Sequence, residues 1–315
     1  MKLENVLFPR PDKCRLVVSA DAAELQQAAD AELAAKPALT GDDLWNNAVN
    51  RALLTGISPL YQQAVKAHNL TPLQDPSFEL LAFDRAQGFT AAAEFCLLPA
   101  LELGRYTGFT QPIEPKPVQE YAILMEINMH QQAAYDAADE AGKAAMRQEA
   151  AARLYEKNCS AAQVLAERQL VLQLGEQVTG FLPKELLNKA HFEEMHRFFL
   201  RMEANKLNFD LYLKGMHQTK EAWEVWMHQM SEQKLRTELG LLLIAQRENL
   251  YPTVDEVTAE LHHWNAAKYQ KPTFLANDIR RIRQRLASDN ARAFVLAHST
   301  LTPPPAEPVI RKAQL

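Results

Sequence analysis

The pattern of apolar and polar positions in the first forty residues predicts a strand followed by a helix. Residues 14–20 are rich in Val and Leu and read as a β-strand. Asp21 comes directly after it, and Glu24 lies three positions further on, the spacing of a capping box. The helix that this box opens is expected to run to about Ala35 and to end at Lys36-Pro37.

The next sixty residues alternate between helix and strand patterns. Helices are expected at 43–54 and at 58–68, the second opened by Ser58 and Pro59. Strands are expected at 78–83 and 89–97, with Gly88 in the loop between them, as in a β-hairpin. Strands mixed with helices in this way indicate a small α+β domain with an antiparallel sheet.

Residues 99–117 interrupt both periodicities and form a connector rich in Pro and Gly, the best domain boundary in the chain. From about residue 118 the pattern is helical. Two of the predicted helices have about 30 residues, or roughly 45 Å at 1.5 Å per residue, and suggest projecting arms. The expected helices cover 118–135, 138–157, 160–179, 183–214, 219–249, 253–269 and 276–298.

The predicted fold is therefore predominantly helical and has two domains. We expect an α+β N-terminal domain over residues 1–112 and an elongated all-α domain with long helical arms over residues 113–300. The proline-rich residues 301–315 are expected to be a disordered tail.

Composition narrows the classes of function. The formal net charge is −5, whereas general nucleic-acid binders are usually basic, so DNA is not an expected partner. The three cysteines are far apart and form no CxxC pair, which predicts neither a zinc site nor a disulfide and fits a reducing compartment. No apolar run approaches the ~20 residues of a membrane span, and the N-terminus lacks a signal-peptide pattern. A cytoplasmic protein without a membrane partner is expected.

Catalytic and metal-binding motifs are not indicated. His191 and His196 are five positions apart, whereas two zinc-binding histidines on one helix face need a spacing of four. No P-loop, GxGxxG or GxSxG sequence is present. We therefore predict no catalytic residue, metal or cofactor. The arginines at 280, 281, 283 and 285 are interpreted as a solvated helix face, with contact to RNA or an acidic partner as the alternative.

Methionine and aromatic residues gather in two of the predicted long helices. Methionine is flexible and polarisable, and aromatic side chains supply much of the binding energy at interfaces. These residues could bind polypeptides, or they could form a core packed between the helices. For each residue considered alone, a place in the core is favoured. Two paired arms, however, cannot bury all of these apolar side chains. The candidate client-binding residues are Met195, Phe198, Phe199, Met202, Phe209, Tyr212, Trp223, Trp226, Met227 and Met230.

The order of these segments resembles trigger factor, the bacterial nascent-chain chaperone. The resemblance is clearest in residues 45–118, where 99–108 read Pro-Ala-Leu-Glu-Leu-Gly-Arg-Tyr-Thr-Gly, close to a tract of that family. Residues 14–35, 182–187 and 240–253 also match in order and context. The resemblance implies an ATP-independent chaperone that holds unfolded or nascent polypeptides on an apolar helical cradle.

Two departures from the family pattern limit what the resemblance implies. The chain runs from Pro117 into helices, which leaves no room for the prolyl isomerase domain, so we expect no enzyme activity. Residues 34–41 also lack the Phe-Arg pair of the ribosome-docking loop, so no docking residue is carried over. Contact with the ribosome and self-association stay open, and a dedicated assembly partner of one protein or complex is the alternative function.

Overall fold

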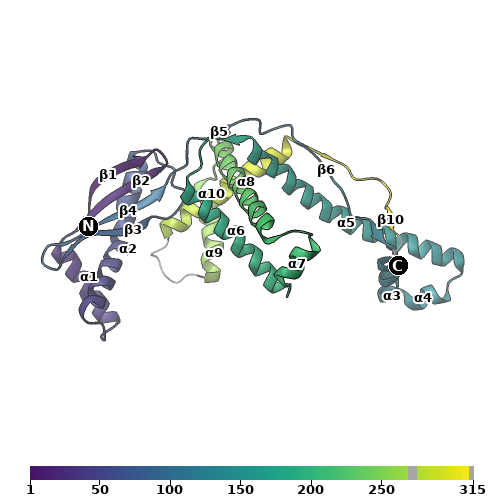
Figure 1. The fold of residues 1–315 in the computed structure, drawn as a ribbon, viewed down its shortest axis with the longest axis horizontal. Helices are drawn as coiled ribbons and strands as arrows, with labels where there is room; N and C mark the ends of the chain where they lie inside the picture. Colours follow the sequence, from purple (N-terminus) through teal and green to yellow (C-terminus); the bar gives the residue numbers. More distant parts are fainter. Residues whose placement is uncertain (269–274, 312–315) are drawn as a thin grey trace.

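The computed structural model describes residues 1–268 and 275–311 and is mostly helical, with a small sheet near the N-terminus (Figure 1). Its strands are β1 (Lys2–Arg10), β2 (Lys13–Ala20), β3 (Ser77–Asp84), β4 (Gly88–Cys96), β5 (Glu102–Leu103), β6 (Thr110–Pro112), β7 (Val118–Gln119), β8 (Val178–Thr179), β9 (Thr300–Thr302) and β10 (Ile310–Arg311). Its helices are α1 (Ala22–Ala35), α2 (Gly41–Ala67), α3 (Glu120–His130), α4 (Gln132–Ala137), α5 (Glu140–Glu176), α6 (Lys184–Ala204), α7 (Phe209–Gly215), α8 (Lys220–Arg247), α9 (Val254–Lys268) and α10 (Leu275–Ala297).

The N-terminal sheet is antiparallel, with strand order β1-β2-β4-β3. Every second residue of β2 is buried, so one face of the sheet packs against α1 and α2 while the other carries polar side chains. The expected strand, hairpin and capping box are confirmed, since Asp21 accepts from the Glu24 amide and the Glu24 side chain accepts from the Asp21 amide. The first strand, β1, had no clear alternation and was not predicted.

Two helix breaks expected from the sequence are absent. α2 is one helix of 27 residues that continues through Pro59, because Ile57 and Tyr61 on either side of the proline pack into the sheet's core. α5 is one helix of 37 residues that continues through Asn158. The Asn158 side chain donates to the Lys116 carbonyl at 2.8 Å, so it ties the connector to the helix rather than ending it.

One further helix break was not predicted. The sequence predicts a single helix over 183–214, but α6 ends at Ala204 and a separate short helix, α7, follows it. The turn between them uses Lys206 with a φ of 52°, and the Leu207 amide donates to the Met202 carbonyl at 2.9 Å. This is a left-handed helix end of the kind usually made by glycine, which explains why the sequence did not reveal it.

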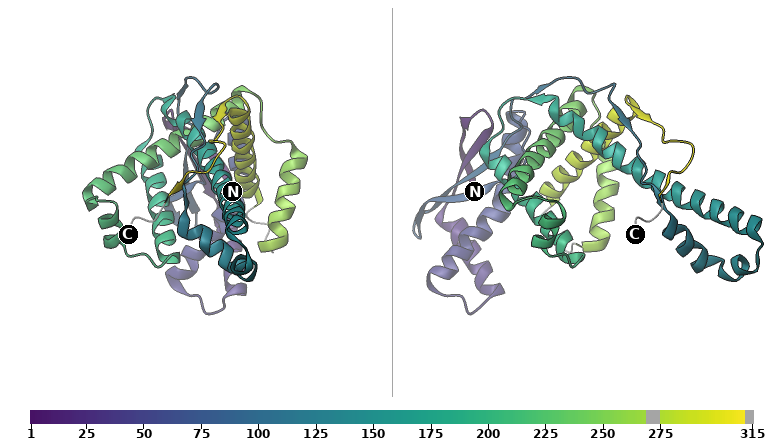
Figure 2. Two further views of the ribbon diagram at one scale, coloured as in Figure 1. Left: turned by 90° about the vertical axis from the view of Figure 1, so that its right-hand side faces the viewer. Right: turned by 45° about the vertical axis from the view of Figure 1, so that its right-hand side comes forward.

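The molecule is elongated. The N-terminal sheet lies at one end and the α3–α4 hairpin at the other, with α5 reaching toward that hairpin (Figure 1). The helices α1–α2, α6–α7 and α9 extend to the same side of the molecule as α3–α4, and the arched outline is also visible after rotation by 45° (Figure 2). The expectation of long helices that project as arms is confirmed.

The N-terminal domain packs against the helices rather than hanging from its connector. Cys96 shares a small apolar core with Leu182, Leu186, Leu235 and Leu239. Around that core Arg10 pairs with Glu185 at 3.2 Å, and the Gln284 side chain donates to the Pro72 carbonyl at 2.8 Å. Arg280 and Arg281 both pair with Asp75 of the N-terminal domain.

The arginine run is therefore only partly the solvated face that the sequence favours. The side chain of Arg280 is 14% exposed, Arg285 pairs with Glu260 and Asp289, and Arg283 lies over the Tyr251 ring. All four arginines therefore contact acidic or aromatic side chains of the same chain.

The end of the chain is ordered further than expected. β9 pairs in parallel with β6, and β10 pairs in parallel with β7. The Tyr155 hydroxyl also donates to the Pro305 carbonyl at 2.6 Å. The prediction of a disordered tail is therefore wrong as far as Arg311. The composition of this segment suggests disorder, but backbone pairing with the connector orders it. Residues 312–315, for which disorder was also expected, lie outside the described residues.

The three cysteines are free thiols. Cys14 and Cys96 are buried, and burial raises the pKa of the Cys14 thiol to about 11 and that of Cys96 above its ordinary value. Across residues 1–268 and 275–311, no helix combines the length and apolar character that crossing a membrane requires.

Candidate functional site

The ten candidate residues lie on one arm, built from α6, α7 and α8. Asn208 caps α7 by accepting from the Leu211 amide, and Thr219 caps α8 by accepting from the Ala222 amide. His217, with a φ of 52°, makes the turn between the two helices. These turns fold α7 back between the ends of α6 and α8, so the three helices share one small core.

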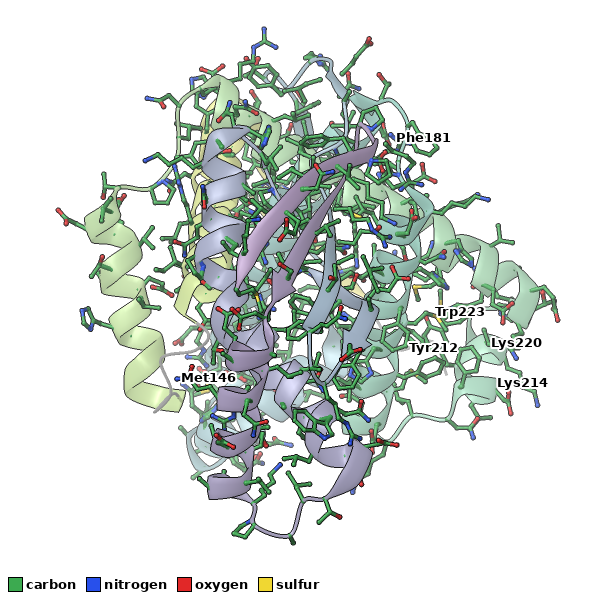
Figure 3. The ribbon with its side chains drawn as sticks, turned by 90° about the vertical axis from the view of Figure 1, so that its left-hand side faces the viewer. Met146, Phe181, Tyr212, Lys214, Lys220 and Trp223 are labelled. Carbon is green, nitrogen blue, oxygen red and sulfur yellow. The ribbon has the colours of Figure 1, made fainter. Side chains whose placement is uncertain are left out.

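Trp223 is the centre of that core and is 1% exposed. Its ring lies 4.9 Å from Phe198 and 4.8 Å from Phe209, measured between ring centroids. Tyr212 of α7 and Trp223 of α8 approach each other at the end of the arm, flanked by Lys214 and Lys220 (Figure 3). Phe198, Met202 and Met227 are also buried here. For these four buried residues the packed-core interpretation fits.

The other six candidates keep some exposed surface. Met195, Phe209, Tyr212 and Met230 are half-buried. Phe199 and Trp226 are each 41% exposed and are the two candidates that most clearly face solvent. The structure therefore separates a buried set, which shapes the arm, from an exposed set that could contact another molecule.

More exposed apolar side chains surround this core than the sequence indicated. Their exposure ranges from 49% at Leu200 to 70% at Phe192. Helical spacing alone could not mark them, because their exposure depends on where α7 packs between its neighbours. The additional residues are Phe192, Leu200, Leu207, Leu211, Met216 and Val225. Together with Phe199 and Trp226 we call these eight residues the arm rim.

Two histidines meet between α6 and α8. The rings of His191 and His228 stack with centroids 3.6 Å apart, and the His191 Nδ1 lies 3.5 Å from the Ser231 hydroxyl. Burial lowers the pKa of His191, and the nearby His228 lowers it further. The sequence analysis considered His191 only together with His196 on the same helix and rejected that pair as a zinc site, whereas the histidine that His191 contacts lies on another helix.

Charged groups join the same two helices closer to the body of the molecule. The buried carboxylate of Glu194 pairs with Lys234 of α8 and, at 2.8 Å, with Arg197 of α6. Glu238 lies beside this cluster and is exposed to solvent. The arm is thus fixed by an aromatic core at its end and by ion pairs further in, and this arrangement holds the arm rim on a stable support.

Comparison with known proteins shows to which family the chain belongs. The family model described as the C-terminus of bacterial trigger factor matches residues 143–295, and the model described as bacterial trigger factor protein matches residues 41–130. Together they cover β3 and β4 of the sheet, the connector and the arm, whereas β1, β2 and α1 lie outside the matched residues. The chain belongs to the trigger factor family. The resemblance inferred from the sequence is confirmed.

Individual trigger factors are similar over shorter stretches. The trigger factor of Bacillus licheniformis is 28% identical over 109 residues, which is 35% of this chain and 26% of that protein. The trigger factor of Limosilactobacillus reuteri is 27% identical over 94 residues, which is 29% of this chain and 21% of that protein. The chain therefore covers only about a quarter of the length of these curated relatives.

A solved structure of the family was also found. It is described as "Promiscuous Substrate Recognition in Folding and Assembly Activities of the Trigger Factor Chaperone". It is 11% identical in sequence, with a TM-score of 0.44, and the match covers 93% of this chain and 99% of that chain.

The two matched family segments are separated by residues 131–142 alone. α4 occupies 132–137, and α5 begins at Glu140. Only the N-terminal and C-terminal trigger factor models match, as the sequence analysis expected from the direct passage of Pro117 into helices.

Proposed function

We propose that this protein is a chaperone that binds unfolded or nascent polypeptides on the arm rim without using ATP. The observation that carries the proposal is the pairing of a rigid aromatic core with a rim of exposed apolar side chains on the same arm, in a chain of the trigger factor family. Phe192, Phe199 and Trp226 supply the largest exposed rings of that rim.

The energetics of such a rim suit reversible binding. Burying a large apolar side chain completely is worth about 1.5–3 kcal/mol, so a side chain that is already about half covered can add roughly half as much. Several such contacts support micromolar binding after the cost of association is subtracted. A client that folds buries its own apolar segments and leaves, so release needs neither a nucleotide nor a catalytic residue.

A preorganised support explains why the core residues matter although they do not face the client. Trp223 and Phe198 fix the relative positions of α6 and α8, and little conformational entropy is then lost when the rim is covered. Methionine at the edge of the rim, as in Met216 and Met230, adapts to clients of different shape.

The proposal predicts suppression of aggregation. A denatured enzyme that aggregates on dilution should stay in solution when an equal amount of this protein is present, and added ATP should not change the effect. Unchanged aggregation at stoichiometric amounts would contradict the proposal. Recovery of one stoichiometric partner from cell extract, with no protection of model clients, would favour a dedicated assembly partner instead.

We also propose that the chain lacks prolyl isomerase activity. The support is that residues 131–142, between the two matched family segments, are far fewer than a catalytic domain needs. Refolding of a protein limited by proline isomerisation should keep its rate when this chain is added. A clearly faster refolding rate would contradict this part of the proposal.

The division into domains is proposed as the sequence analysis gave it, with a boundary at residue 112. Its support is that the first apolar core contains residues between Met1 and Leu97 and none of the arm helices. Limited proteolysis should cut first in the connector of residues 99–117, and a first cut inside α2 or β4 would argue against this boundary.

A further inference from the structure

The far end of the molecule carries an exposed apolar stripe that the arm rim does not include. It lies on α3, whose Ile123 and Ile127 are buried among the residues that pack this helix onto α5. The opposite face of α3 presents Tyr121, Leu124, Met125 and Met129, which are 56%, 38%, 56% and 67% exposed. Their spacing of three, four and eight positions from Tyr121 places them along one face of the helix. We call these four residues the α3 stripe.

A groove runs beside this stripe. It has a volume of about 580 Å³ and lies between α3, α5 and the segment that leads into β10. Leu124 belongs both to the groove and to the α3 stripe, so the two surfaces are continuous. Much of the remaining lining is apolar and includes Ala144, Ala151, Pro308 and Ile310. The volume is within the range of sites that take small ligands or a few side chains.

The groove exists because the end of the chain is tied down. β10 pairs with β7 immediately before α3, and the Val118 amide donates to the Val309 carbonyl at 2.9 Å. This pairing places Pro308 and Ile310 opposite α5 as one wall of the groove. A helix stripe and a fixed wall together make a defined site, whereas scattered apolar residues would not.

Among the residues that the structure describes, the edge of the groove carries more acidic than basic side chains. Of the charged residues that line it within the described ranges, Glu120 and Glu307 are acidic and Arg147 is basic, with its guanidinium over the Tyr135 ring at 5.7 Å. Within the part of the chain that the structure describes, neither Glu120 nor Glu307 forms an ion pair. An incoming segment with a Lys or Arg beside its apolar residues would complement these carboxylates.

The size of the surface limits the occupant. Four partly exposed side chains and one groove offer a few hundred Å², whereas a stable protein interface buries about 800 Å² on each partner. A second copy of the chain docked here alone would not form a stable dimer. A short segment of an unfolded chain needs only a small contact, and the flexible methionines of the stripe can adapt to it.

We propose that the α3 stripe and its groove form a second polypeptide-binding site, which takes a short apolar segment flanked by a basic residue. The inference rests on the proposed chaperone function and specifies the chemistry of the client at a place remote from the arm rim. A client long enough to touch both surfaces gains from linkage, because the second contact becomes intramolecular.

The test measures binding of a labelled short peptide to the full chain by fluorescence anisotropy. The peptide has an aromatic and aliphatic centre with one flanking Arg, and a twin carries Glu in place of the Arg. The Arg peptide should bind more tightly than its twin to the unaltered protein. The double variant Leu124→Asp, Met125→Asp should weaken binding of the Arg peptide about tenfold, equivalent to ~1.4 kcal/mol. Glu307→Lys should remove the preference for Arg over Glu.

The matched control is Leu165→Asp on α5, since Leu165 is 51% exposed and does not line the groove. This variant should bind the Arg peptide as the unaltered protein does. Circular dichroism checks that each variant is folded. A photo-crosslinking version of the peptide should also attach within residues 120–129 or 144–152, which locates the site without any substitution.

The outcomes separate this site from the arm rim. If Trp226→Asp weakens peptide binding while the Leu124→Asp, Met125→Asp variant binds normally and no crosslink falls on α3 or α5, the second site is wrong and the proposed function stands. If the unaltered protein binds no peptide and protects no client, the proposed function fails as well. A concentration-dependent dimer that the double variant abolishes would make the occupant a second copy and overturn the peptide assignment.

Discussion

Trp223 and Trp226 are three positions apart on one helix and have opposite environments. Trp223 is 1% exposed at the centre of the arm's aromatic core, whereas Trp226 is 41% exposed on the arm rim. Trp223→Ala should lower the free energy of unfolding by about 3–5 kcal/mol, because it leaves a large cavity. Trp226→Ala should cost less than ~1 kcal/mol. Hydrogen exchange in α6–α8 measures both effects, and equal protection in the two variants would show that the core is not organised around Trp223.

We expect the stability of the arm to depend on pH through His191. Because folding lowers the pKa of His191 from its ordinary value of 6.5, the folded arm binds fewer protons there than the unfolded chain does. The contribution to stability is therefore present above about pH 6.5 and is lost as the pH falls through the lowered pKa. Thermal unfolding should show a loss of stability over that range that is smaller in His191→Gln. An identical pH dependence in the two proteins would rule out this histidine as the cause.

At the scale of single residues, the sequence predicts what is local and misses what depends on packing. The Asp21–Glu24 capping box was predicted because its partners are three positions apart. The burial of Trp223 and the exposure of Trp226 could not be distinguished, since both belong to the same methionine and aromatic pattern and α7 decides between them. The stacking of His191 on His228 joins two helices and left no trace in the spacing of the histidines.

Close contact between α5 and α8 depends on glycine. A Cβ atom added at Gly175 would lie 2.6 Å from the Gln233 carbonyl oxygen and 2.7 Å from the Thr237 hydroxyl. Gly175→Ala should therefore force the two helices apart and lower the free energy of unfolding by roughly 1–3 kcal/mol. Gly215→Ala is the matched control, because nothing lies within 4 Å of its added Cβ, and it should be neutral. Urea unfolding compares the two, and equal midpoints would contradict this packing.

At the scale of elements, the existence of the helices was predicted better than their ends. The break expected at Asn158 is absent because that side chain is used for a contact with the connector. The break after Ala204 was missed because Lys206 adopts the left-handed conformation that glycine usually provides. The turns that build the arm therefore carry little sequence signal, so the sequence alone could not show which residues of the arm are exposed.

At the scale of the whole molecule, ion pairs hold the N-terminal domain against the helices. Asp75 pairs with both Arg280 and Arg281, which come more than two hundred positions later. Asp75→Asn should loosen this interface and increase the radius of gyration measured by small-angle X-ray scattering, with a larger effect at low salt than at high salt. Asp42→Asn, which removes an exposed ion pair with Arg85 inside the N-terminal domain, is the control and should not change it. No change for Asp75→Asn would mean that the ion pairs of Asp75 do not hold this interface together.

The overall plan of an α+β domain followed by helical arms could be derived from the sequence because it depends on the periodicity of long segments. The path of the chain end could not, since β9 and β10 consist of very few residues that pair with a distant connector. That pairing also forms the wall of the groove beside α3, so this second surface became visible only in the folded molecule.

The most direct test of the account is the affinity of a permanently unfolded protein for the arm rim. Calorimetry should give micromolar binding to the unaltered chain and binding at least about tenfold weaker for the double variant Phe192→Asp, Trp226→Asp, with Leu165→Asp unchanged. Equal affinity in all three proteins, with the variants folded, would contradict the claim that the exposed rim of the helical arm holds the client.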